Sequence, residues 1–229
     1  MSAEFLTGTH TLADGRQVKF REVTGGTLAK FNRTNDSLLG MSHYVADCVL
    51  EVESVKPEDA VAFVSSLDVY DFTMLLKSIR TLSYSNVLDE AELQCAPNSQ
   101  HSSVVTFKPL IDLDTLQTRP PDPAYLKQKH KGIGEVEVRS LTWGMLVGFG
   151  DNATMDVVFL ARVISVDGRP FVGMSTLNGR AVRFIKRQFE ALDGDAGTEV
   201  VAHCPECGIA YELDLLTSKA LAMDFFGLV

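Results

Sequence analysis

The first hydrophobic pattern in the chain is a short alternation on either side of a turn signal. Asp14-Gly15 stands between His10-Thr11-Leu12 and the alternating pair Val18 and Phe20. Glycine readily takes the positive φ that tight hairpin turns require. The pattern therefore predicts a β-hairpin over residues 9–23, followed by a short helix capped by Thr24.

Two longer stretches have the three- and four-residue spacing of amphipathic helices. Between Leu38 and Val55 the apolar residues form one stripe, which predicts a helix facing the core. Cys48 belongs to this stripe and is interpreted as a small buried hydrophobe. A second helix is predicted from Asp68, where an acidic cap precedes a stripe of apolar residues that runs to Leu82.

Proline residues divide the chain near its middle. The sequence from Thr118 to Pro123 holds three prolines, which lack a backbone donor and restrict the residue before them. It cannot continue a helix. We therefore expect a first α+β repeat over residues 1–117, a Pro-rich linker over 118–134 and a second α+β repeat over 135–229.

The two halves show internal similarity. Residues 17–31 and 135–149 align without a gap and share six identities in fifteen positions. The identical pairs are Val18 with Val136, Arg21 with Arg139, Thr24 with Thr142, Gly26 with Gly144, Leu28 with Leu146 and Phe31 with Phe149.

Three further blocks follow in the same order in both halves. Residues 52–55 lie opposite 163–166, residues 65–84 opposite 175–194, and residues 95–98 opposite 204–207. Amphipathic helices can share a period without a common origin, but this does not account for the strand-helix block or the shared order. The sequence predicts an α+β fold of two diverged repeats, each with a hairpin or strand, helices and a knuckle followed by a short strand.

The motif Cys204-Pro-Glu-Cys207-Gly208 supplies two thiolates, which is half of a tetrahedral zinc site. We take Cys95 and His203 as the other candidate ligands, with His101 as an alternative. Asn98, at the position that corresponds to Cys207, is a poor zinc ligand. Structural thiols without metal remain an alternative. A redox pair is disfavoured because a strand-like sequence, rather than a helix, follows the first cysteine. The cofactor expectation is therefore either none or structural zinc.

Composition narrows the functional classes. Hydrophobic residues make up 45% and charged residues 22%, which is ordinary for a globular protein. The net charge of -9 is spread along the chain, and the basic residues at 127–131 are interpreted as a solvated loop, so no nucleic-acid partner is expected. The chain has no apolar run long enough to cross a membrane and no signal peptide within residues 1–12, which predicts a cytosolic location.

Sequence templates for common catalytic sites are absent, so the chain is not expected to be an enzyme or to have a small-molecule substrate. Its last ten residues are apolar, with Asp224 as the one charge. Phe225, Phe226 and Leu228 are predicted to contact a partner protein, and Trp143 is interpreted as either a packing residue or a further interface residue. Docking of the tail on the chain's own core is the alternative.

The motifs together resemble a family of bacteriophage proteins, the baseplate and baseplate-hub assembly proteins of T-even-like contractile tails. The likeness rests on residues 135–142 (EVEVRSLT), the helix before each knuckle, Ser83-Tyr84, residues 204–208 and Phe225-Phe226. It implies a non-catalytic component whose partners are other tail and baseplate proteins, located in the host cytoplasm during assembly and then in the virion tail. The competing hypotheses are a thiol- or metal-dependent enzyme that uses Cys204 and Cys207, and a zinc-ribbon adaptor.

Overall fold

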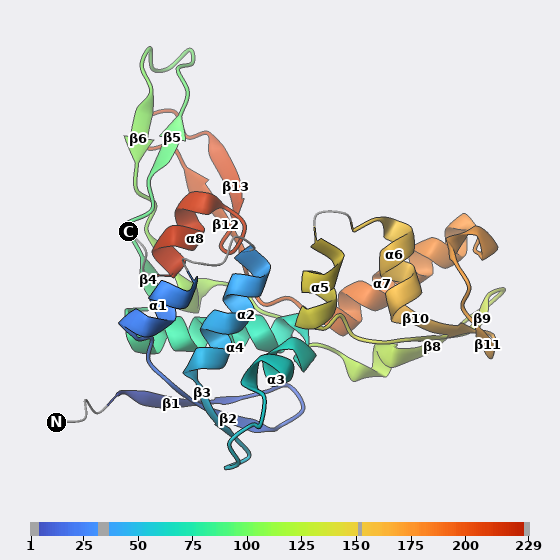
Figure 1. The fold of residues 1–229 in the computed structure, drawn as a ribbon. Helices are drawn as coiled ribbons and strands as arrows, with labels where there is room; N and C mark the ends of the chain where they lie inside the picture. Colours follow the sequence, from blue (N-terminus) through green and yellow to red (C-terminus); the bar gives the residue numbers. More distant parts are fainter. Residues whose placement is uncertain (1–4, 32–36, 151–152, 227–229) are drawn as a thin grey trace.

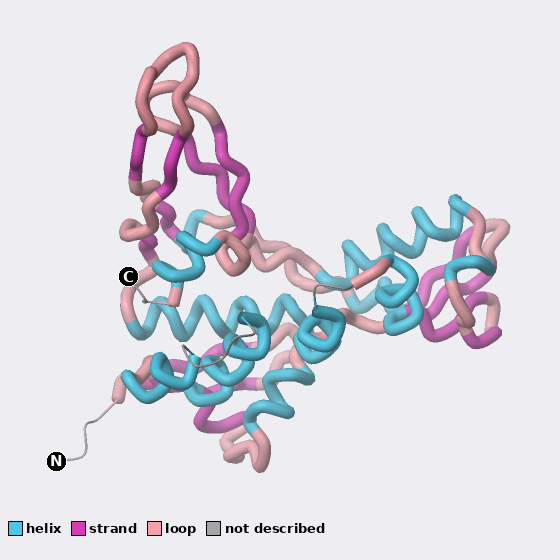
Figure 2. Tube along the Cα trace, turned by 45° about the horizontal axis from the view of Figure 1, so that its top comes forward, coloured by secondary structure: helices cyan, strands magenta, loops and turns pink. Residues whose placement is uncertain are grey.

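The computed structural model describes residues 5–31, 37–150 and 153–226, and its fold is α+β. Figure 1 shows three parts: a first unit of helices over a small sheet, a second unit to one side, and an arm of strands that projects from the first unit. Figure 2 shows the arm as the part of the molecule built mainly from strands, which stands away from the helices. None of the described helices combines the length and the apolar character needed to cross a membrane.

The first unit is built on a three-stranded antiparallel sheet with the order β1-β2-β3. The predicted hairpin forms, with Gly15 at a φ of 90° in its turn. The apolar side chains of β2 point into the core while their neighbours face outward, as the alternation predicts. Its elements are β1 (Thr7–Thr11), β2 (Gln17–Arg21), α1 (Gly25–Phe31), α2 (Ser37–Cys48), β3 (Val49–Val52), α3 (Ala60–Ser66) and α4 (Val69–Ser83).

The second unit is built on a four-stranded antiparallel sheet with the order β11-β10-β9-β8. Helix α7 crosses this sheet, and its apolar side chains form a separate core with the strands. Its elements are η2 (Pro123–Leu126), β8 (Lys127–His130), β9 (Gly134–Val138), α5 (Trp143–Phe149), α6 (Met155–Arg162), β10 (Val163–Val166), β11 (Arg169–Pro170), η4 (Met174–Thr176) and α7 (Gly179–Asp193).

The central strands of the two sheets pair in the same way. In the first sheet Val18 lies opposite Val52 and Phe20 opposite Val49, with an irregular register between them. In the second sheet Val136 lies opposite Val166 and Val138 opposite Val163, again with an irregular register. Residues with positive φ angles follow β3 and β10: residues 53 and 54 in the first unit, and residues 167 and 168 in the second.

This pairing changes one detail of the sequence alignment. Residues 49–52, and not 52–55, occupy the place of residues 163–166. The predicted helix over residues 38–55 was therefore too long, because α2 ends at Cys48 and a strand follows without a break. Residues 49–52 begin and end with valine, and β-branched residues favour strands.

The arm consists of short strand pairs from both halves of the chain. From the first half come β4 (Val87–Leu88), paired with β7 (Ile111–Asp112), and the hairpin of β5 (Leu93–Cys95) and β6 (Val105–Phe107). The chain then passes through η1 (Leu113–Thr115) to the second unit. It returns as the hairpin of β12 (Glu199–His203) and β13 (Ala210–Asp214), followed by α8 (Lys219–Phe225).

The expected boundaries are wrong at two places. The segment 118–134 is not only a linker, because its second half contains β8, which pairs with β9 along its whole length. The polar sequence of this edge strand gave no hydrophobic signal. The segment 199–226 leaves the second unit and packs on the first, where Val200, Leu215 and Phe226 join the larger core.

Candidate metal centre

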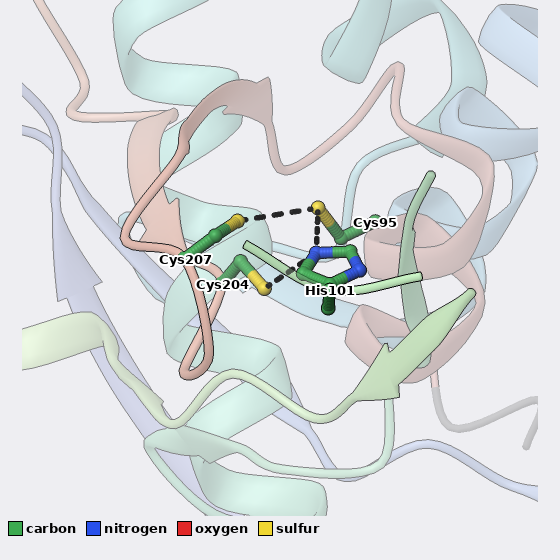
Figure 3. A group of neighbouring side chains, drawn as sticks. All are labelled: Cys95, His101, Cys204 and Cys207. Carbon is green, nitrogen blue, oxygen red and sulfur yellow. Dashed lines mark hydrogen bonds between the residues drawn. The ribbon is translucent and has the colours of Figure 1, made fainter. Parts of the chain in front are cut away.

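Four potential metal ligands meet at the outer part of the arm. Cys95 comes from the end of β5, His101 from the loop that follows it, and Cys204 and Cys207 from the turn between β12 and β13. The ligand atoms of all four lie within 4.8 Å of one another. Figure 3 shows the three sulfur atoms and the imidazole facing a common centre.

The distances between these atoms suit a tetrahedral ion. Zinc bound by sulfur at 2.3 Å and by nitrogen at about 2.05 Å would separate sulfur atoms by about 3.8 Å and sulfur from nitrogen by about 3.6 Å. Cys95 Sγ lies 3.6 Å from Cys207 Sγ and 3.3 Å from His101 Nε2, and Cys204 Sγ lies 4.0 Å from His101 Nε2. The cysteines are free, because a disulfide would need a sulfur separation near 2.05 Å. The set of three thiols and one imidazole therefore fits zinc.

The turn from Cys204 to Ile209 directs two thiols to the same side. The Gly208 amide donates to the Cys204 carbonyl at 2.9 Å, and the Cys204 amide donates to the Ile209 carbonyl at 3.0 Å. Gly208 has a φ of 70°, which a residue without a Cβ adopts at little cost. This backbone geometry explains why Gly follows the second cysteine.

Asn98 shapes the loop that carries His101. Its Oδ1 accepts from the amides of Gln100 at 2.8 Å and His101 at 3.3 Å. The His101 Nδ1 lies 2.8 Å from the Ser103 carbonyl, which places the ring proton on Nδ1 and leaves the Nε2 lone pair facing the thiols. Asn98 is thus a support for the ligands and not a ligand itself.

Hydrogen bonds to the Cys207 sulfur stabilise its charged form. The Ile209 backbone amide, helped by the Asn98 side chain at 3.3 Å, lowers the pKa of Cys207 to about 6. A thiolate is the form that binds a metal, so Cys207 is available as a ligand at neutral pH. The interaction of Tyr211 with the Cys95 thiol raises the pKa of Tyr211 to about 12. The phenol therefore stays protonated at neutral pH.

His203 does not join the site, so its assignment as a ligand was wrong. Side chains alternate along β12, with Val200 and Ala202 buried and Val201 and His203 exposed. Cys204 continues the buried series, so its neighbour His203 points to the other face. The His203 ring instead lies 3.3 Å from the Gly208 carbonyl. His101 takes its place, although it precedes Cys204 by 103 residues.

Comparison with protein-family models, curated proteins and solved structures finds no match for this chain. The geometry of the four side chains therefore carries the functional argument.

The predicted interface residues are buried in the chain's own core. Trp143 is 1% exposed, stacks on Phe72 with ring centroids 3.6 Å apart, and donates from its indole nitrogen to Ser42 Oγ at 2.8 Å. It joins the second unit to the first. Phe225 and Phe226 are each 1% exposed, so the prediction of a partner contact at these residues is wrong and the alternative of self-docking holds. Leu228 lies outside the described residues.

A buried ion pair fixes the C-terminal helix below the metal centre. Asp224 accepts from the Arg80 guanidinium at 3.4 Å and from the backbone amides of Glu90 at 2.7 Å and Ala91 at 3.0 Å. The one charge in the apolar tail is therefore paired and hydrogen-bonded, as burial of a carboxylate requires. Cys48, by contrast, lies apart from the metal centre, and burial raises the pKa of its thiol to about 12.

Proposed function

We propose that this protein is a non-catalytic structural or assembly component whose two halves are joined by one structural zinc ion. The observation that carries the proposal is the complete set of four protein ligands, Cys95, His101, Cys204 and Cys207, from two hairpins. Structural zinc sites use four protein ligands, whereas catalytic sites keep a position for water or substrate. A site filled by this set has no position left for a reacting molecule.

The arm supports a structural role for the metal. Its two hairpins have only two strands each, and isolated two-stranded hairpins are at best marginally stable in water. Between the hairpins we find one aromatic contact, Phe107 with Tyr211, at 6.1 Å between ring centroids. Zinc binding contributes roughly 10 to 16 kcal/mol in small zinc-dependent folds, which is enough to hold such hairpins together.

The assembly that we propose is the baseplate of a contractile phage tail, which the sequence resemblance implies. The support is the resemblance itself, together with an extended arrangement of two units and an arm that offers several separate surfaces. Its partners would be other tail and baseplate proteins, and its place of action the host cytoplasm during assembly and the virion tail.

We further propose that the two units arose by duplication. Three observations favour this origin: the shared strand order, the irregular register between β2 and β3 and between β9 and β10, and the six identities between residues 17–31 and 135–149. The arm then formed when the two knuckle hairpins, Cys95 with His101 and Cys204 with Cys207, came together around one ion.

Two experiments test the proposed function. The first is mass spectrometry of purified tail particles, and of a pull-down with the tagged chain from infected cells. Recovery of baseplate proteins with the chain supports the proposal, and their absence from both samples contradicts the tail assignment.

The second experiment separates the structural role from a metal-dependent enzyme. In the cobalt-substituted chain, a site closed by four protein ligands keeps its visible spectrum when azide is added. A shift of the cobalt bands on azide binding would reveal an open position, and would favour the enzyme hypothesis that uses Cys204 and Cys207.

A further inference from the structure

Although acidic residues occur along the whole chain, the net charge is divided unevenly between its parts. Residues 118–196, which include the second unit, hold 11 basic and 9 acidic residues, whereas the rest of the chain holds 10 and 21. The net charge is therefore +2 in this segment and -11 elsewhere. Such a separation creates fields of opposite sign at two ends of one molecule.

The positive charge is concentrated on the outer face of α7. Arg180, Arg183 and Arg187 are exposed and lie three and four residues apart, so they follow one another along the same face of the helix. Among the described residues, no carboxylate oxygen lies within 4.0 Å of their guanidinium nitrogens. Glu190 is the acidic residue next to this row. We call Arg180, Arg183 and Arg187 the arginine row.

A fourth arginine extends the basic surface beyond the arginine row. Arg119, in the Pro-rich segment, donates to the Glu190 carbonyl at 3.0 Å and is thereby held beside the last turn of α7. Its backbone pairs with Asp195, which keeps the segment in place. Guanidinium groups pair with carboxylates through two parallel hydrogen bonds, so a row of unpaired arginines fits an acidic protein surface.

The arm carries a surface of the complementary charge. Residues 198–218 contain four acidic residues and no Lys or Arg. Glu199 and Glu212 are exposed on the outer face of the β12–β13 hairpin, on either side of Val201, which is 59% exposed. We call Glu199, Val201 and Glu212 the acidic face.

Two acidic side chains stand directly opposite each other on this hairpin. Glu199 faces Asp214 across the strand pair. The Asp214 carboxylate accepts hydrogen bonds within the chain, from the Thr198 hydroxyl at 2.6 Å and from the backbone amides of Leu216 and Thr217 at 2.9 Å each. Like charges opposite each other weaken a hairpin, so a cationic partner at Glu199 would relieve a cost that the isolated chain bears.

We propose that the acidic face of one copy of this chain binds the arginine row of a second copy. Within one chain the two surfaces cannot meet, because the β12–β13 hairpin stands in the arm while α7 runs through the second unit on the other side (Figure 1). Successive arginines on α7 are separated by about 6 Å, and diagonal carboxylates on a hairpin by about 7 to 8 Å, so two guanidinium–carboxylate pairs form together.

The contact joins different surfaces of the two copies. A head-to-tail contact of this kind leaves one free arginine row and one free acidic face, so it continues to a ring or a filament. The inference goes beyond the proposed function and does not depend on it, because it rests on the charges of the chain alone.

The test is the mass of the purified, zinc-loaded chain, measured by sedimentation velocity over a range of concentrations. At roughly 50 mM salt the mass should rise with concentration, and at about 500 mM salt it should fall back to that of the monomer, since salt screens exposed charges. The double variant Arg183→Glu/Arg187→Glu should associate at least about tenfold more weakly. The control Lys19→Glu/Lys56→Glu, with the same change in net charge, should associate like the original chain.

A charge exchange makes the test specific. The variant Glu199→Lys/Glu212→Lys should also self-associate more weakly than the original chain. It should, however, bind the Arg183→Glu/Arg187→Glu variant when the two are mixed. Circular dichroism and thermal melting check that each variant is folded.

Three outcomes would overturn the proposal. One is a chain that remains monomeric up to roughly 100 μM at low salt, and another is association that the arginine changes leave intact. The third is the absence of self-association combined with arginine-dependent binding to a DNA duplex of roughly 20 base pairs, which would assign the arginine row to nucleic acid.

Discussion

Cys95 and Cys207 are 112 residues apart in the sequence, and their sulfur atoms lie 3.6 Å apart in the arm. The entire second unit is inserted between the two hairpins that carry them. A metal ion held by both hairpins therefore closes a long loop, and it joins the end of the chain to the first unit. Bringing the ends of a loop of this length together costs conformational entropy when the chain folds. Metal binding, which needs the folded arrangement of ligands, offsets this cost.

Removal of the metal should destabilise the arm first. We expect that a strong chelator lowers the melting temperature and increases amide hydrogen exchange in β5, β6, β12 and β13, because these short hairpins have little other support. The core of the second unit, around Phe159 and Ile185, should keep its protection from exchange. Uniform loss of protection in all parts, or no change on chelation, would contradict this account.

The two histidines near the knuckle should behave differently. His101→Ala removes a ligand and should lower zinc affinity by at least about a hundredfold, whereas His203→Ala removes an exposed side chain and should leave affinity unchanged. A competition titration with a colorimetric zinc chelator measures both. Equal losses in the two variants would mean that the metal is held in another way.

Much of this architecture could be predicted from the sequence, because it depends on local patterns. The hairpin at Asp14-Gly15 and the cap at Thr24 follow from turn and capping residues, and the structure has both. The helix predicted from Asp68 also forms, although the Asp68 side chain makes no capping hydrogen bond. Local patterns could not give the end of α2, since residues 49–52 fit a helix stripe as well as a strand.

The fourth ligand could not be selected from the sequence alone. His203 adjoins Cys204, while His101 is distant, and only the pairing of the two hairpins brings His101 into place. The one sequence signal against His203 as a ligand was the alternation of side chains along β12. Val200, Ala202 and Cys204 form the buried series, so His203 lies on the opposite face. The burial of Phe225 and Phe226 likewise depended on the packing of α8 against Tyr44 and Phe31, which lie far away in the sequence.

Trp143 provides an optical probe of the contact between the units, because it is the one tryptophan in the chain. We expect blue-shifted fluorescence in the native state and a red shift on unfolding. Trp143→Ala should reduce the free energy of unfolding by about 3 to 5 kcal/mol, since it removes a fully buried ring from its stack on Phe72. A Trp143→Phe variant keeps the stack and loses the Ser42 hydrogen bond, so it should cost less. If the native chain emitted at the wavelength of a solvent-exposed tryptophan, the contact between Trp143 and Phe72 would be contradicted.

The acidic residues at the junction of the two units should make stability depend on pH. Burial, together with Asp71, raises the pKa of Asp68 to about 6, and Asp193 and Asp14 add to the shift while a hydrogen bond from Ser140 opposes it. The native state thus favours the protonated acid. This contribution is complete below the ordinary pKa of an aspartic acid, and it is lost as the pH rises through about 6.

Asp68→Asn should therefore raise stability at neutral pH by about 1 kcal/mol, a value reduced for the partial exposure of the side chain. Urea unfolding between pH 4 and pH 8 measures the effect, with Asp89→Asn as a control that removes an exposed carboxylate. The difference between Asp68→Asn and the original chain should vanish at the acidic end of the range. A variant that is less stable at neutral pH would show that the ionised carboxylate is favourable.

The most direct test of the central claim is the metal content of the purified chain, measured by inductively coupled plasma mass spectrometry beside its Cys95→Ser and Cys204→Ser/Cys207→Ser variants. The chain is expressed under reducing conditions without added metal and is then desalted. We predict about one zinc ion per chain, and a loss of most of it in both variants, because the ligands come from both hairpins. Zinc that is retained when Cys95 is replaced, a content well below one ion per chain, or iron in place of zinc would contradict a structural zinc centre that joins the two halves.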